Sequence, residues 1–238
     1  MQLLSRGVTR FHDWYDKRRT IPHRMVEQAR QAGLIGSVDW ISVGPKDERQ
    51  TVKNYTLDKL IDHRPLRGEL YRIAAGGSEP SPWEMRLALF PFDKSLNQVK
   101  GFNILSLWFE AEPWFGPERS DALTKLFRTI HTADNTEVGF IHPYERWSEL
   151  TDTLRGPYGE PVTAAPLFTG IFWVNFLGAG HLSLFKLEQL RDLQTYQVEW
   201  ENEQGLFIRV CQDVAESTSP AIEEEMFRLT NNFKSALK

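Results

Sequence analysis

Four segments of the chain have the apolar content and the length of β-strands. Residues 83–90 alternate between hydrophobic and polar side chains, and residues 102–109 and 137–141 are short apolar runs. Residues 171–177 are apolar, rich in aromatic and β-branched side chains, and end at Gly178. Short runs of this kind, bounded by turn residues, predict strands rather than helices.

Two other segments have the spacing of amphipathic helices, and each follows a proline that suits the first helical turn, Pro117 or Pro220. Their apolar stripes are Leu123, Leu126, Phe127 and Ile130 in the first, and Ile222, Met226, Leu229, Phe233 and Leu237 in the second. Residues 196–200 and 206–210 predict a hairpin around a polar turn. Strands in pairs beside helices predict an α+β fold, a mainly antiparallel sheet with helices packed on one face.

The beginning of the chain has a different pattern, and we expect residues 1–75 to form a mainly helical, basic segment. A helical pattern starts near Pro22 and ends at Gly33 or Gly36. Residues 57–61 repeat the helical spacing before further turn residues follow. This segment is therefore expected to pack as helices beside the strands.

The segment 76–82 is rich in Gly, Ser and Pro, but a stretch of 7 residues suits an ordinary loop better than a tether. With 238 residues, 41% of them hydrophobic, the chain is long enough to bury one sizeable core. We therefore expect a single α+β domain over residues 1–238, with the strand and helix core in residues 83–238.

Charge is distributed unevenly along the chain. Residues 1–72 carry 14 basic and 9 acidic side chains, whereas residues 73–238 carry 14 basic and 23 acidic ones. Residues 188–225 contain 10 acids against two arginines. A field of this sign repels nucleic acid and attracts a basic protein partner, although a solvated acidic face has the same composition.

Motifs for catalysis or for cofactor binding are missing from the sequence. The six histidines form no HxxxH or HExxH pair, and one cysteine, Cys211, cannot build a thiolate metal site. The Gly178-Ala179-Gly180 loop lacks the third glycine of a dinucleotide fingerprint, so we interpret it as a turn. We expect no cofactor and no metal.

One enzymatic alternative stays open. Glu110 and Glu112 are two positions apart on an extended segment, so their carboxylates share a face. Together with a histidine such as His142, they would suit a small metal-dependent hydrolase or nuclease. His131 with Asp134 is a second possible hydrolytic pair.

The sequence gives little sign of a nucleic-acid or membrane partner. Residues 10–19 are basic and aromatic, but two aspartates interrupt them. The first residues lack the apolar core of a secretory signal, and no run approaches the roughly 20 apolar residues that span a bilayer. We expect a cytoplasmic protein.

Several short motifs occur in an order that resembles a bacterial toxin-immunity family, immunity protein fifty-two. They are Trp14-Tyr15, residues 101–107, the block of Trp173, Asn175, Phe176 and Gly178, residues 205–208, and the final helix that starts at proline. The polar turn 201–204 departs from the pattern. The resemblance implies a protein that neutralises a cognate toxin by binding it, protecting the producing cell. It also implies that this toxin is a cytoplasmic, restriction-endonuclease-like nuclease secreted by a type VI system.

The resemblance and the charge together suggest which residues bind such a basic nuclease. The acidic and aromatic candidates are Glu199, Trp200, Glu201, Glu203, Glu112 and Trp114. We interpret Trp173, Asn175, Phe176 and Gly178 as fold-making: the Asn175 amide is expected to bond backbone in a neighbouring loop, and Gly178 to permit a sharp turn. A scaffold subunit that self-associates is a third possibility.

Overall fold

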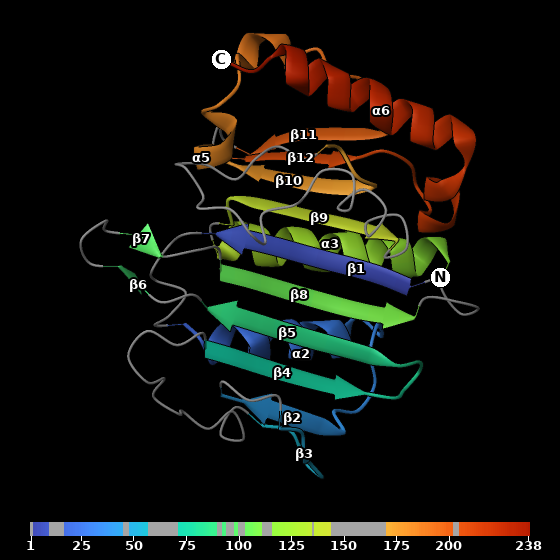
Figure 1. Ribbon diagram of the computed structural model, residues 1–238. Coiled ribbons are helices and arrows are strands. Elements are labelled where there is room, and N and C mark those ends of the chain that lie inside the picture. The colour runs from blue at the N-terminus through green and yellow to red at the C-terminus, as the bar shows by residue number, and fades with distance from the viewer. Residues whose placement is uncertain are drawn as a thin grey trace.

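A computed structural model describes residues 2–9, 17–44, 48–56, 71–89, 92–93, 98–99, 103–110, 116–134, 136–143, 170–201 and 205–238. Its main feature is a ten-stranded sheet in the order β11-β12-β10-β9-β1-β8-β5-β4-β2-β3, in which every neighbouring pair is antiparallel (Figure 1). The sheet is built from β1 (Gln2–Thr9), β2 (Trp40–Val43), β3 (Gln50–Thr51), β4 (Tyr71–Gly77), β5 (Trp83–Leu89), β8 (Asn103–Glu110), β9 (Val138–Pro143), β10 (Val174–Gly178), β11 (Gln197–Glu201) and β12 (Gly205–Arg209). Strands β6 (Phe92–Asp93) and β7 (Gln98–Val99) form a separate pair.

The helices are α2 (Thr20–Gln31), α3 (Pro117–Ala133), α5 (Ala179–Leu182) and α6 (Pro220–Ser235), with 3-10 turns η2 (Leu187–Gln189) and η3 (Val214–Thr218). The α+β class and the antiparallel sheet are confirmed. The predicted strands near residues 83, 102 and 137, the hairpin and both proline-initiated helices are present with boundaries shifted by a few residues.

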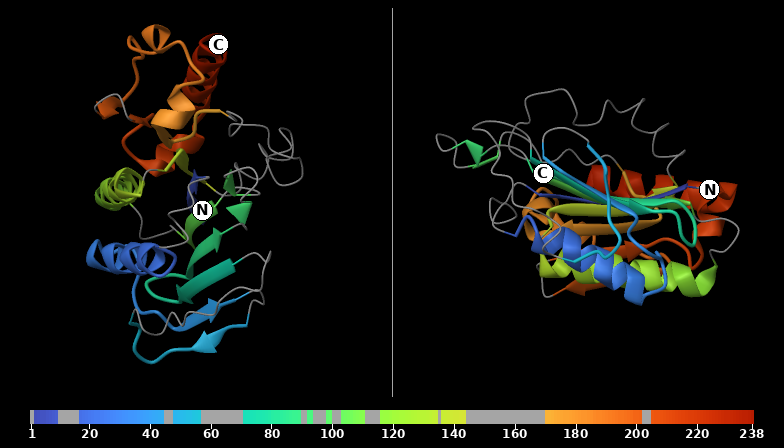
Figure 2. Two further views of the ribbon diagram at one scale, coloured as in Figure 1. Left: turned by 90° about the vertical axis from the view of Figure 1, so that its left-hand side faces the viewer. Right: turned by 90° about the horizontal axis from the view of Figure 1, so that it is seen from below.

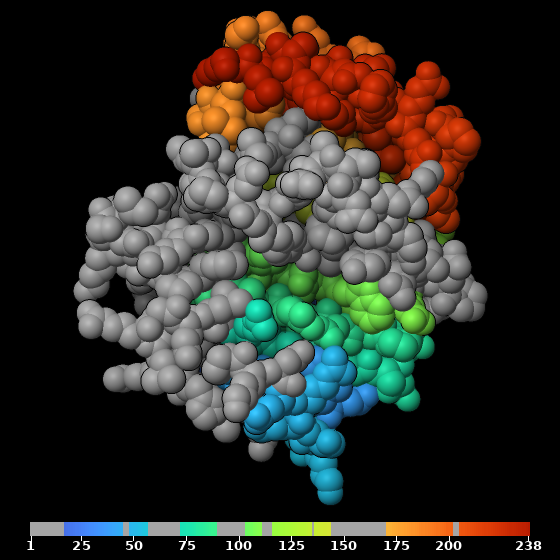
Figure 3. Space-filling view, viewed as in Figure 1, coloured from blue at the N-terminus to red at the C-terminus, as the bar shows by residue number. Residues whose placement is uncertain are grey.

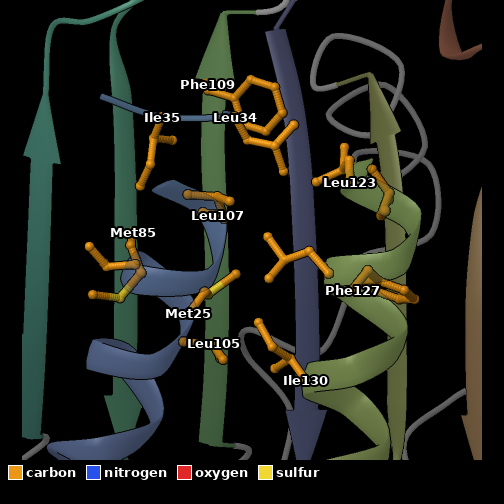
Figure 4. Close-up of a cluster of buried hydrophobic side chains, with 14 of the residues drawn as sticks. Met25, Leu34, Ile35, Met85, Leu105, Leu107, Phe109, Leu123, Phe127 and Ile130 are labelled. Atoms are coloured by element: carbon orange, nitrogen blue, oxygen red, sulfur yellow. The ribbon is translucent and has the colours of Figure 1, made fainter. Parts of the chain in front are cut away.

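Two faces of the sheet carry different helices. Helices α2 and α3 lie on one side, which we call the first face, and their apolar residues pack there against alternate residues of β5 and β8 (Figures 2 and 4). Helix α6 packs on the opposite side, the second face, against Leu177, Leu206 and Ile208. We expected all helices to pack on one face of the sheet. This holds for α2 and α3, whereas α6 covers the other face near β10 and β12.

The expectation of a mainly helical segment over residues 1–75 is wrong for the part of it that the structure describes. Helix α2 is present, but β1, β2, β3 and most of β4 also lie there. Strand β1 pairs with β8 and β9, roughly a hundred residues later in the chain, so its place is fixed by long-range partners. The helix expected at residues 57–61 lies outside the described residues.

The segment 76–82 was interpreted as a loop, but its first two residues, Gly76 and Gly77, are the end of strand β4. A Cβ on Gly76 would lie 2.4 Å from the Trp40 ring, and one on Gly77 would lie 2.2 Å from the Ser37 carbonyl oxygen. These glycines therefore allow close approach within the sheet rather than a turn.

Strand β10 begins at Val174, three residues after the start of the apolar run at residue 171. The reason is that the Asn175 side chain bonds the backbone just before the strand. Its side-chain oxygen accepts from the Phe172 N–H at 2.8 Å, and its amide nitrogen donates to the Phe172 carbonyl at 2.7 Å. Both Phe172 backbone groups are thus bonded to a side chain instead of to a neighbouring strand.

Candidate functional site

Strand β11 carries three of the residues expected to bind a partner, and it lies at the edge of the ten-stranded sheet. Successive side chains of a strand point to opposite faces. Glu199 and Glu201 therefore point to the first face, where α3 lies, and Trp200 points to the second face, where it packs partly buried against the core under α6. The three residues do not form one surface, which corrects the expectation of a combined acidic and aromatic patch.

The two glutamates bind the same arginine of α3. Arg128 Nη1 lies 2.5 Å from a carboxylate oxygen of Glu199, and Arg128 Nε donates to Glu201 at 2.5 Å. Thr132 Oγ1 also donates to Glu201, at 2.8 Å. These contacts join the last strand of the sheet to α3, so both carboxylates have a structural role.

Glu199 also receives a hydrogen bond from Gln197, the next residue on the same face, at 2.5 Å. This bond and the Arg128 guanidinium lower the pKa of the Glu199 carboxyl. With a side chain 40% exposed against 16% for Glu201, Glu199 is the more accessible of the two. One arginine between two carboxylates leaves the cluster with a net negative charge.

Three further candidates, Glu112, Trp114 and Glu203, lie outside the described residues. The described acids of the same half of the chain are more widely spread than the sequence suggested. Glu188 is exposed within η2 and Asp192 shortly after it, Glu216 is exposed in η3, and Glu224 is exposed on α6. We call these four exposed carboxylates, which all lie in the C-terminal part of the chain after β10, the acidic end.

The block of Trp173, Asn175, Phe176 and Gly178, on which the resemblance rested, belongs to the core. Trp173 is fully buried, and its indole N–H donates to the Cys211 carbonyl at 2.9 Å. Phe176 is buried on the first face, and Asn175 bonds the backbone of Phe172, in the preceding loop, as expected.

Gly178 is required for a different reason from the one expected. Its φ of −77° is accessible to any residue, so conformational freedom at the turn is not the cause. A Cβ there would lie 2.3 Å from the Thr136 carbonyl oxygen, and the Gly178 N–H donates to the Glu137 carbonyl at 2.8 Å. The segment after α3 thus lies directly against the backbone of β10.

Glu110 and His142, two residues of the proposed hydrolase or nuclease site, are not adjacent in the structure. Glu110 is on β8 and His142 is on β9, and β1 lies between these two strands. On β1, Gln2 is paired with Glu110, whereas Leu4 is paired with His142. They are therefore two strands apart and two positions out of register. The His142 ring is buried 5.2 Å from the Phe172 ring, an apolar contact.

The pair of His131 with Asp134 does not form either. His131 Nδ1 lies 2.7 Å from Thr136 Oγ1, and the ring packs against Phe127. Asp134 is buried and forms an ion pair with Arg24 of α2. That ion pair joins the two helices of the first face.

Burial changes the pKa of two histidines and of the cysteine. It lowers the pKa of His131 to about 3 and that of His181 to about 4, and it raises the pKa of the Cys211 thiol to about 12. Both imidazoles are therefore neutral at neutral pH, and the Cys211 thiol is protonated and not activated as a nucleophile.

We expect the free energy of unfolding to fall as the pH falls below neutral. Folded His131 and His181 resist protonation until about pH 3 and 4, whereas the same side chains in the unfolded chain titrate near 6.5. Between these values the unfolded state binds more protons, so stability is complete above about 6.5 and declines by up to roughly 1.4 kcal/mol per pH unit for each histidine. Urea denaturation across this range measures the slope. His131→Gln should make it shallower, and a flat profile between pH 7 and 5 would contradict the prediction.

Within the ranges that the structure describes, no three His, Cys, Asp or Glu side chains gather as metal ligands would. None of the helices placed there is long and apolar enough to cross a membrane.

Sequence reasoning missed Arg128, the residue that organises the two glutamates of β11. Its partner Glu201 is 73 residues away along the chain, and no local pattern indicates that contact. The separation of Trp200 from Glu199 and Glu201 did have a signal, because the predicted hairpin already implied that alternate residues point to opposite faces.

Comparisons with known proteins give a likeness of fold. No protein-family model matches the chain, and no curated protein matches its sequence. Among solved structures, a Pseudomonas aeruginosa chain described as T6SS protein PA0821 superimposes with a TM-score of 0.61 at 15% identity, over 97% of this chain and 72% of that one. Nearly the whole chain thus has a fold similar to that of this T6SS protein.

Proposed function

We propose that this protein is an immunity protein, which binds a cognate nuclease toxin of a type VI secretion system and neutralises it without catalysing a reaction. The observation that carries the proposal is the structural likeness, over 97% of the chain, to a protein described as belonging to that secretion system. The resemblance of the Trp173 block and its companion motifs to a toxin-immunity family gives the narrower role.

Electrostatics supports a basic partner. The acidic end carries the exposed carboxylates Glu188, Asp192, Glu216 and Glu224, and the Glu199–Arg128–Glu201 cluster adds a further net negative charge. Nuclease surfaces that hold phosphate are basic, and an acidic surface steers their association and can cover them. Since Glu199 and Glu201 also stabilise the fold, the four carboxylates of the acidic end are the better test of the interface.

The test first identifies a candidate toxin among the genes that neighbour the one encoding this chain, and then produces that toxin together with the chain. We expect the wild-type chain to restore growth and to copurify with the nuclease. The variant Glu188→Lys/Glu224→Lys should slow association by about tenfold, because it reverses the charge of two exposed carboxylates that form no ion pair with the described residues. Association rates from surface plasmon resonance at two salt concentrations measure this effect.

The matched control is Glu48→Lys/Glu79→Lys, which makes the same charge change at exposed positions near the opposite end of the sheet. It should leave the association rate within about twofold of wild type. Absence of binding and of protection by the wild-type chain would reject the proposed function. Equal effects of both variants would reject the acidic end as the interface.

A further inference from the structure

Strand β11 is the last strand of the ten-stranded sheet, and it has a strand neighbour, β12, on one side only (Figure 1). The C-terminal part of the chain, which includes α6, forms this end of the molecule at the top of the space-filling view (Figure 3). Along its other side, which we call the open edge, Gln197–Glu201 accept and donate no backbone hydrogen bond within the part of the chain that the structure describes. All residues of β11 are partly exposed. An unpaired strand edge of this kind is a template for a further strand.

The direction of the backbone groups can be followed across the sheet, starting from β9. In an antiparallel sheet the N–H and C=O groups of one residue point to the same neighbouring strand, and those of the next residue point to the other neighbour. The Gly178 N–H donates to the Glu137 carbonyl at 2.8 Å, on the β9 side of β10. Asn175 and Leu177 therefore direct their backbone groups to the other side, where β12 lies.

The same alternation continues from β12 to β11. The β12 partners of Asn175 and Leu177 are Ile208 and Leu206, so the backbone groups of these two β12 residues bond β10. The residues opposite them on β11 are Val198 and Trp200. Because their opposite residues are bonded on the far side, Val198 and Trp200 direct their N–H and C=O groups to the open edge, where each offers a donor and an acceptor.

Side chains beside the open edge are acidic on one face of the sheet and apolar on the other. Glu199 and Glu201 lie on the first face, and Arg128 is the one described cation that pairs with them, so the first face is negative there. Val198 and Trp200 lie on the second face and pack against the core under α6. The side chains of an added strand lie beside those of β11 on the same face. A basic residue would therefore contact the carboxylates, and an apolar residue would extend the core.

We propose that the basic partner adds an extended segment to the open edge as a further antiparallel strand, in which basic and apolar residues alternate. The antiparallel direction follows that of every neighbouring pair in this sheet. A second copy of the chain is the less suitable occupant, because its own β11 would bring further glutamates beside Glu199 and Glu201, and like charges on neighbouring strands repel. The opposite edge of the sheet, β3, has only 2 residues and is a poorer template. The inference rests on the proposed function for the partner, but the open edge can be tested without it.

The test measures binding of a fluorescein-labelled short peptide, in which lysine and valine alternate, to the full chain by anisotropy. A block isomer of the same composition and an alternating peptide of glutamate and valine are the comparison probes. The alternating lysine peptide should bind at least about tenfold more tightly than either.

Backbone methylation of the peptide tests the hydrogen bonds separately from the charge. In the proposed antiparallel pair the valines lie opposite Val198 and Trp200, and their N–H groups donate to the open edge. N-methylation of the valines should abolish binding to the wild-type chain. N-methylation of the lysines, whose N–H groups point away, should change the affinity by less than about threefold.

The variant Val198→Pro tests the same bonds from the side of the protein. It removes an N–H group that points outward and no hydrogen bond to β12, and proline is tolerated at such edge positions. It should weaken binding of the alternating lysine peptide by at least about tenfold. The matched control Val198→Ala also loses packing under α6 but keeps the N–H group, and it should stay within about threefold of wild type. Thermal denaturation shows whether each variant is folded, and the methylated peptides report on the wild-type chain alone.

Equal binding of the alternating and block peptides, or equal effects of the two methylations, would overturn strand addition at the open edge. A dimer of the chain in sedimentation velocity that Val198→Pro dissociates would overturn the basic partner in favour of a second copy. A candidate toxin that bound wild type and Val198→Pro equally well would reject the open edge as its contact and leave the proposed function standing. Absence of toxin binding by wild type would instead reject the proposed function, whatever the peptides showed.

Discussion

Gly178→Ala is expected to lower the free energy of unfolding by about 3 kcal/mol, and the melting temperature by roughly 10 °C. The new methyl group would lie 2.3 Å from the Thr136 carbonyl oxygen, a backbone atom that cannot rotate away. Relief requires β10 to separate from residues 136–137, which would weaken the hydrogen bond from Gly178 to Glu137. Urea and thermal denaturation measure the loss.

Gly180→Ala is the matched control, two residues later in α5. Nothing lies within 4 Å of a Cβ at that position, and alanine favours a helix more than glycine does. Stability should be unchanged or slightly higher. If the two variants were equally stable, the close contact would not explain why a glycine occupies position 178. A stable Gly178→Ala chain that no longer bound the proposed toxin would place Gly178 in the proposed interface.

Arg24→Ala is expected to cost about 3 kcal/mol, because it removes the cation that compensates a buried carboxylate. The Asp134 side chain is 1% exposed, and Arg24, reaching from α2 to the end of α3, is 36% exposed. Loss of the arginine removes this ion-pair partner from a carboxylate that is buried between the helices. Urea denaturation at neutral pH measures the loss.

Arg30→Ala is the matched control, because it removes an exposed ion pair from the same helix, α2. Arg30 pairs with Glu27 one turn away, at 3.0 Å, with both side chains partly exposed. Such surface pairs contribute a few tenths of a kcal/mol, so this variant should be nearly as stable as wild type. A large effect at Arg30, or a small one at Arg24, would contradict the role assigned to the buried ion pair.

Local sequence patterns were sufficient for the elements whose partners are close along the chain. The hairpin of β11 and β12, the helices that begin at Pro117 and Pro220, and the alternating strand β5 follow from spacing, turn residues and proline positions. The structural role of Asn175 also followed, because a buried amide must find backbone partners nearby.

Only the tertiary structure decided the features that depend on distant residues. Strand β1 lies in the middle of the sheet because β8 and β9 pair with it. Strands β10 and β12 have buried apolar side chains on both faces of the sheet, and α6 covers those on the second face. The Glu199–Arg128–Glu201 cluster likewise joins segments well separated in sequence. The sequence by itself determined an antiparallel α+β protein with an acidic second half. Which carboxylates bind their own chain and which are exposed was decided by packing, because a contact between residues far apart in the chain has no local pattern.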